Sequence, residues 1–159
     1  MTHEIGLISD THGLLRPDVH AALAGVELIL HAGDVGGEEI LHELALIAPV
    51  RAVFGNTDPR DHPGLVDELD ILIGGLRVHV SHGHEVRRPT PALLAATYEA
   101  DVLVYGHTHR QLVETVGSTV VVNPGAAGAR RFDLEPSVAR LRIARRRARV
   151  TLIPLAYEA

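Results

Sequence analysis

The chain has 159 residues, a formal net charge of −5 at pH 7 and no cysteine. This length fits a single domain, residues 1–159, that can bury a core of its own. The lack of cysteine excludes disulfides and thiolate metal ligands, and the acidic charge argues against a general nucleic-acid-binding surface.

The first residues, Met1 to Glu4, lack the basic segment of a signal peptide and lead directly into an apolar strand. Elsewhere no apolar run approaches the ~18 residues of a membrane-spanning helix. We therefore expect a cytoplasmic protein with no membrane partner.

Strands and helices alternate in the first third of the chain. Pro17 can open a helix that Gly25 ends, and Pro49 stops a second helix. The expected order is strand 5–8, helix 18–24, strand 26–30, helix 38–47, strand 50–54 and then a loop over 58–64. Strands separated by helices imply parallel pairing.

The remainder of the chain is mainly β. Gly74-Gly75 predicts the turn of a hairpin between strands 69–73 and 76–80, and Thr90 can cap a helix over 91–98. Further strands are expected over 102–105, 111–116, 119–122, 138–144 and 148–155. The pattern predicts an α/β (α+β) domain in which two sheets pack face to face with helices outside.

An arginine-rich segment, 140–149, invites a nucleic-acid interpretation. Arg140 and Arg142 alternate with apolar residues, however, as in a strand with one solvated face. No aromatic residue is interleaved to stack on bases. We interpret the segment as a solvated hairpin with a turn at residues 145–147.

Polar residues that can bind metals follow five of the expected strands. In an extended chain residues i and i+2 point to the same side, so Asp10 and His12 can face one point. One such pair often serves only to end a strand. The polar residues that follow the other four strands are Asp34, Asn56, the pair His82 and His84, and the pair His107 and His109. Because ligands gather beyond the carboxyl ends of strands, the set predicts a metal centre.

These motifs, taken in order, resemble those of the calcineurin-like metallophosphoesterases. They are Asp10-x-His12, Gly33-Asp34, Gly55-Asn56, His82-Gly83-His84 and Gly106-His107-Thr108-His109, followed by Asn123-Pro124-Gly125. The small single-domain phosphodiesterases of that superfamily fit best. The resemblance implies a four-layer αββα sandwich, which agrees with the two sheets expected above.

The resemblance also implies a dinuclear centre. One ion would bind Asp10, His12, Asp34 and His109, and the other would bind Asp34, Asn56, His82 and His107. Asp34 would bridge the ions through two free oxygens. We favour manganese, with iron, zinc, nickel or cobalt as alternatives. A hydroxide shared by the two ions would attack a small phosphate ester, either a diester or a monoester.

Other assignments are less determined by their spacing. His84 lies two residues after His82, so it could contact substrate. It is also a candidate to protonate the leaving group, because many relatives carry a histidine for this task where this chain has Thr57. His31 either orients a ligand or is simply a strand residue. Asp58 either bonds to a ligand or, as we favour, caps the following loop. Arg131 is a candidate substrate-binding residue, although Arg130 replaces the proline that often precedes it.

Two alternatives remain open at this stage. A non-catalytic scaffold exists on the same fold in the retromer subunit of the superfamily, but a scaffold has no need of all seven ligands. The other alternative is a nuclease for short oligonucleotides, although the chain lacks a basic groove. The resemblance also allows a homo-oligomer, since relatives often form dimers or tetramers.

Overall fold

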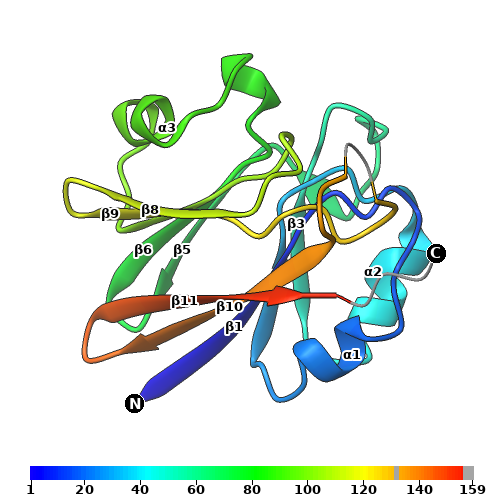
Figure 1. Ribbon diagram of the computed structural model, residues 1–159, viewed down its shortest axis with the longest axis horizontal. Helices are drawn as coiled ribbons and strands as arrows, with labels where there is room; N and C mark the ends of the chain where they lie inside the picture. Colours follow the sequence, from blue (N-terminus) through cyan, green and yellow to red (C-terminus); the bar gives the residue numbers. More distant parts are fainter. Residues whose placement is uncertain (131–132, 156–159) are drawn as a thin grey trace.

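Apolar side chains on both faces make the first strand, β1 (Thr2–Ile8), the centre of a sheet. Leu7 packs toward a second sheet, whereas Ile8 packs toward helices. The computed structural model describes residues 1–130 and 133–155, and Figure 1 shows how their elements are arranged. None of the helices among these residues is long and apolar enough to cross a membrane.

The first sheet has six strands in the order β11-β10-β1-β2-β3-β4. Besides β1 they are β2 (Leu28–His31), β3 (Val50–Val53), β4 (Leu65–Val66), β10 (Ser137–Ala144) and β11 (Arg147–Pro154). The strands β1 to β4 are parallel, and β10 pairs antiparallel to both β1 and β11. The expected parallel pairing of the first three strands is confirmed.

The second sheet has five strands in the order β5-β6-β7-β9-β8. They are β5 (Leu69–Ile73), β6 (Leu76–Val80), β7 (Val102–Val104), β8 (Leu112–Val116) and β9 (Thr119–Asn123). The strands β6, β7 and β9 are parallel, while β5 and β8 close the two edges as hairpins. The carboxyl ends of β6 and β7 therefore share one edge of this sheet.

Three apolar clusters hold four layers together. The largest, which includes Leu30 and Val104, fills the space between the sheets. A second joins the outer face of the six-stranded sheet to α1 (Val19–Ala22) and α2 (Glu38–Leu44). A third joins the five-stranded sheet to α3 (Pro91–Thr97), on the opposite side of the molecule (Figure 1). The predicted αββα sandwich is confirmed.

The helices are shorter than expected, and two short elements were not predicted. The segment that follows α2 tightens before Pro49, because Leu46 and Ile47 donate to carbonyls three residues back. The strand β4 directly follows the region expected to be loop, and the Phe54 amide donates to the Val66 carbonyl. A single 3₁₀ turn, η1 (His84–Val86), follows the end of β6. Runs of two or three residues carry too little periodicity to be recognised.

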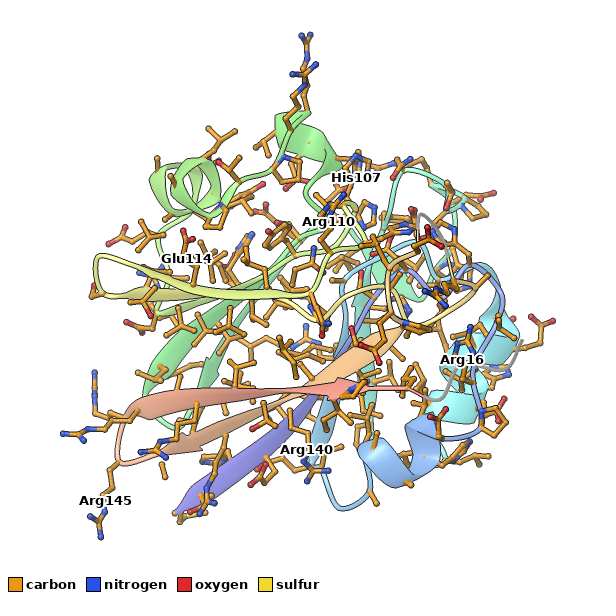
Figure 2. The ribbon with its side chains drawn as sticks, in the orientation of Figure 1. Arg16, His107, Arg110, Glu114, Arg140 and Arg145 are labelled. Atoms are coloured by element: carbon orange, nitrogen blue, oxygen red, sulfur yellow. The ribbon has the colours of Figure 1, made fainter. Side chains whose placement is uncertain are left out.

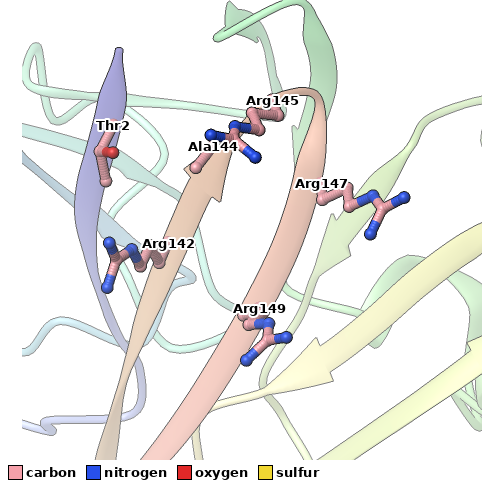
Figure 3. Close-up of a pocket in the computed structure, with 6 residues that line it drawn as sticks. All are labelled: Thr2, Arg142, Ala144, Arg145, Arg147 and Arg149. Carbon is pink, nitrogen blue, oxygen red and sulfur yellow. The ribbon is translucent and has the colours of Figure 1, made fainter.

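The arginine-rich segment forms the hairpin β10–β11, as predicted. Its turn is Arg145-Arg146, with φ of 53° and 58°, and β11 begins at Arg147. Arg142 and Arg149 are cross-strand partners on the exposed face, where a cavity of about 460 Å³ lies (Figure 3). Arg145 lies at the opposite end of the molecule from His107 (Figure 2). The turn of the hairpin is therefore remote from the candidate ligands.

Candidate metal centre

Five loops meet at one edge of the sandwich. They follow β1, β2 and β3 in one sheet and β6 and β7 in the other, and parallel pairing puts the carboxyl ends of each set together. The structure brings all seven expected ligands to this edge: Asp10, His12, Asp34, Asn56, His82, His107 and His109. The two carboxylates and His82 are buried, whereas Asn56 is exposed.

The backbone at this edge is left-handed rather than extended. Positive φ values occur at Asp10 (52°), His12 (46°), Asp34 (55°), His107 (71°) and His109 (64°). Such values disfavour residues with a Cβ and cluster at functional sites. The alternation of an extended strand was therefore the wrong reason to expect Asp10 and His12 to converge. They do converge, with 3.6 Å between His12 Nε2 and Asp10 Oδ1, because each sits in a tight turn.

Glycine is required beside the ligands because the loops approach each other closely. A Cβ on Gly55 would collide with the carboxylate and backbone nitrogen of Asp34. A Cβ on Gly106 would collide with the side chains of Ser9 and Asp10. The glycines of the motifs thus permit contact between loops that carry different ligands.

Asp10 directs only one of its oxygens into the cluster. Its Oδ2 accepts hydrogen bonds from the Ser9 hydroxyl (2.6 Å) and the His107 amide (3.1 Å). Its Oδ1 lies 3.3 Å from His109 Nε2 and 3.9 Å from His82 Nε2. Within the described residues this buried Oδ1 makes no hydrogen bond, and neither does Nε2 of His12.

Asp34 is held in the same way by Thr57. The Thr57 hydroxyl (2.8 Å) and amide (2.9 Å) both donate to Oδ1. Oδ2 lies 3.2 Å from His82 Nε2 and 3.6 Å from His12 Nε2. The expectation of two free oxygens on Asp34 was wrong, because Thr57 occupies one and a single oxygen faces both histidines.

His82 adds a third group that can offer a lone pair to the cluster. Its Nδ1 donates to the Ala32 carbonyl (2.7 Å), which leaves a lone pair on Nε2 in the neutral ring. This Nε2 lies 3.0 Å from Asn56 Oδ1, and His107 Nδ1 lies 3.2 Å from the same oxygen. In this orientation of the amide, nitrogen and oxygen lone pairs converge, as they do around a cation.

The electrostatics of the cluster agree with that geometry. Burial alone would raise the pKa of Asp34, but His82 and Thr57 outweigh it and hold the pKa at about 2. Burial would also raise the pKa of Asp10, yet His109 and His12 keep it well below its ordinary range. Burial lowers the pKa of His82, but Asp34 and Asp10 raise it above its usual value. Two ionised carboxylates therefore lie in one cluster, which favours positive charge.

Nitrogen and oxygen atoms that lie about as close together as these are suitable ligands for a divalent metal ion. Two groups have ligand atoms that all lie within 4.8 Å of one another: Asp10 with His12 and His109, and Asp10 with Asp34 and His82. The uncompensated Oδ1 of Asp10 and Nε2 of His12 fit an ion in the first group. The cavity over the cluster has a volume of about 230 Å³.

His31 braces two of the ligand-bearing loops rather than contacting a ligand. Its Nδ1 accepts from the Gly33 amide (3.1 Å), so Nε2 donates to Thr11 Oγ1 (3.0 Å), which in turn donates to the Val35 carbonyl (2.7 Å). The residue is fully buried, and burial lowers its pKa to about 4. The neutral ring thus links the loop after β1 to the loop after β2.

Asp58 has a structural role, as we favoured, but its hydrogen bonds run to the two ligand-bearing loops rather than to the loop that follows it. Its carboxylate accepts from the amides of Val35 (3.0 Å), Gly36 (3.3 Å) and Gly55 (2.8 Å). It therefore ties the Asp34 loop to the Asn56 loop.

His84 starts η1, with its ring centre 5.3 Å from that of His82 and 6.3 Å from that of His107. Arg131 lies outside the described residues.

The sequence did not reveal the structural roles of three residues that support the site. Ser9 and Thr57 each hold one oxygen of a carboxylate, and their position directly beside a ligand is the only signal that could have identified them. Asn123 donates to the Gly106 carbonyl (3.1 Å) and to Thr108 Oγ1 (3.0 Å). It thereby fixes the loop that carries His107 and His109, a role that the Asn-Pro-Gly segment did not reveal.

Comparison with known proteins identifies related chains over most of this length. The model of the calcineurin-like phosphoesterase superfamily domain matches residues 4–146. A probable metallophosphoesterase of Methanothermobacter thermautotrophicus is 40% identical over 149 residues, covering 87% of this chain and 85% of the relative. A phosphodiesterase of Methanocaldococcus jannaschii is 30% identical over 140 residues, covering 77% of this chain and 82% of that relative.

Among solved structures, vacuolar protein sorting 29 of Cryptosporidium parvum is similar with a TM-score of 0.80. The match covers 98% of this chain and 99% of that one, with 21% sequence identity. This likeness concerns the fold.

Replacing Thr11 with valine tests the brace between the loops. The change leaves the His31 Nε2–H without an acceptor, while the Val35 carbonyl keeps the hydrogen bond from the Gly13 amide. Because an unpaired buried polar group costs about 1–3 kcal/mol, Thr11→Val should lower the free energy of unfolding by ~1–3 kcal/mol. Urea denaturation in the presence of EDTA measures it.

Thr115→Val is the matched control, since Thr115 is exposed on β8 and should change stability by less than ~0.5 kcal/mol. Equal stabilities for the two variants would contradict the brace.

Proposed function

Since the chain belongs to the calcineurin-like phosphoesterase superfamily, we propose that it hydrolyses phosphodiesters through a dinuclear metal centre. The observation that carries this proposal is the convergence of Asp10 Oδ1, Asp34 Oδ2 and the Nε2 atoms of His12 and His82. The two oxygens belong to ionised carboxylates, and each histidine nitrogen can offer a lone pair when its ring is neutral. Such a set favours the binding of cations.

We assign two ions to this set. Asp10, His12 and His109 would hold one, and Asn56, His82 and His107 would hold the other. Asp34 would contribute Oδ2 to both, since that oxygen faces His12 as well as His82. Mn²⁺ is the first metal to test, because nitrogen and oxygen ligation also accepts Fe, Zn, Ni or Co.

When bound, two divalent ions would bind the phosphate oxygens and lower the pKa of a shared water so that it can act as nucleophile. The chain's own residues then orient the site. Thr57 holds Oδ1 of Asp34, so its hydroxyl proton is already donated and is not available to the leaving group. His84 lies next to His82 and His107, which makes it the candidate proton donor.

A non-catalytic metal-binding module is the alternative function. The likeness to vacuolar protein sorting 29 is compatible with it, but that likeness concerns the fold. The two functions differ in one measurable respect. A module that only binds metal would take up the ions and leave every phosphate ester intact.

Replacing Asp34 with asparagine tests the bridging role. A neutral amide oxygen cannot balance two cations, so Asp34→Asn should reduce metal-dependent hydrolysis of bis(4-nitrophenyl) phosphate to below about a tenth. Asp67→Asn is the control, because Asp67 is exposed and pairs with Arg60. Activity of Asp34→Asn above that level would exclude the two-metal mechanism.

Single histidine replacements test the division into two sites. His12→Ala and His109→Ala should weaken one ion, while His82→Ala and His107→Ala should weaken the other, each by more than about tenfold. Calorimetric titration of the metal-free variants with Mn²⁺ measures both affinities, and the exposed His42→Ala is the control. Equal weakening of both ions in all four variants would show that the grouping is wrong.

The dependence of rate on the leaving group tests for a proton donor. General acid catalysis is typically worth ~10²–10⁴ in rate, so without it turnover of aryl diesters should fall steeply as the leaving-group pKa rises. A flat dependence would require an acid. If His84→Ala then made it steep, His84 would be that acid, and an unchanged flat slope would exclude His84.

A further inference from the structure

A second cavity lies beside the candidate metal centre. It has a volume of about 320 Å³, between the start of α2 and the loop that follows β3. Its apolar walls are Val35, Leu41, Pro59 and Leu65. A volume near 300 Å³ with mainly apolar walls is typical of sites that bind small organic groups.

The cavity and the metal centre adjoin each other. Thr57 lines both of them, and Val35 directly follows Asp34. The cavity over the centre is smaller, about 230 Å³, and it is lined by two threonines and by proposed ligands. A phosphate fits such a lining, but an apolar ester group does not. That group would find apolar contacts in the adjoining cavity.

The polar groups of the second cavity favour an uncharged occupant. Asp58 is the one carboxylate among the described residues that line it, and three backbone amides already bind this side chain. His62 Nδ1 accepts from the Gly64 amide (3.0 Å), so the neutral ring carries its proton on Nε2. Among the described residues that line the cavity, His62 therefore offers a hydrogen-bond donor from its ring, and none is an arginine or a lysine.

We propose that this cavity binds an uncharged, apolar ester group of the substrate, while the phosphate binds at the metal centre. This inference rests on the proposed function and specifies its substrate class. The site selects diesters with aryl or similar neutral groups and disfavours substrates with a second phosphate. His62 donates to an acceptor atom on the bound group.

Phenylphosphonate and methylphosphonate test the cavity without requiring turnover. Both present the same phosphonate to the metal centre, and only the first carries an apolar ring. Titration calorimetry with the Zn²⁺-loaded protein should find phenylphosphonate bound at least ~10-fold more tightly, because the ring leaves water.

A filling substitution locates the effect. Leu41→Trp should reduce the preference for phenylphosphonate to about twofold or less and leave methylphosphonate binding unchanged, since the new ring occupies apolar space. Leu46→Trp is the matched control, because Leu46 follows the same helix but is 81% exposed. This control should keep the full preference.

Methyl NMR of the wild-type protein provides a second readout that does not depend on a variant folding. Diamagnetic Zn²⁺ permits it, and phenylphosphonate should shift the methyl resonances of Val35, Leu41 and Leu65 more than methylphosphonate does.

Equal binding of the two ligands, a preference that survives in Leu41→Trp, or no selective methyl shifts would overturn the cavity proposal alone. If neither ligand bound the Zn²⁺-loaded protein, the phosphoesterase proposal would fail and the cavity proposal with it.

Discussion

Two buried, ionised carboxylates at the meeting edge of the sheets are the constraint on which the site depends. Asp10 and Asp34 each have one oxygen held by a neighbouring hydroxyl, from Ser9 and Thr57, and the other directed at histidine nitrogens. An unpaired buried charge is strongly unfavourable, so this arrangement favours the uptake of cations. Hydrogen bonds to the other oxygen of each carboxylate fix the direction of the two inward oxygens.

The loops achieve this through backbone conformations that ordinary residues avoid. Left-handed turns at Asp10, Asp34 and His107 aim their side chains at the edge, and glycine at position 106 admits the loop after β1. Hydrogen bonds from buried side chains then stabilise these turns. Asp58 binds amides of two loops and also lines the second cavity, so one residue fixes the metal centre and the proposed substrate site together.

The sequence predicted the fold well because its strands are marked by apolar runs that end in polar residues. The sandwich follows from that pattern, and so does the gathering of the seven polar residues at one edge. The pattern does not describe what happens after a strand ends. It suggested an extended geometry for Asp10 and His12, and the family resemblance suggested two free oxygens on Asp34. Both expectations failed because the turn conformation and the Thr57 hydrogen bonds arise only when loops distant in sequence meet. The two-residue strand β4 was missed for a similar reason, since Leu65 is ordered by packing rather than by periodicity.

The central claim is that two metal ions share Asp34, and anomalous diffraction tests it most directly. Crystals grown with Mn²⁺ and measured on either side of the manganese absorption edge should give two peaks about 3.5–4 Å apart. One peak should lie against His12 and His109 and the other against His82 and His107, with Oδ2 of Asp34 between them. A single peak, or peaks away from these side chains, would contradict the account.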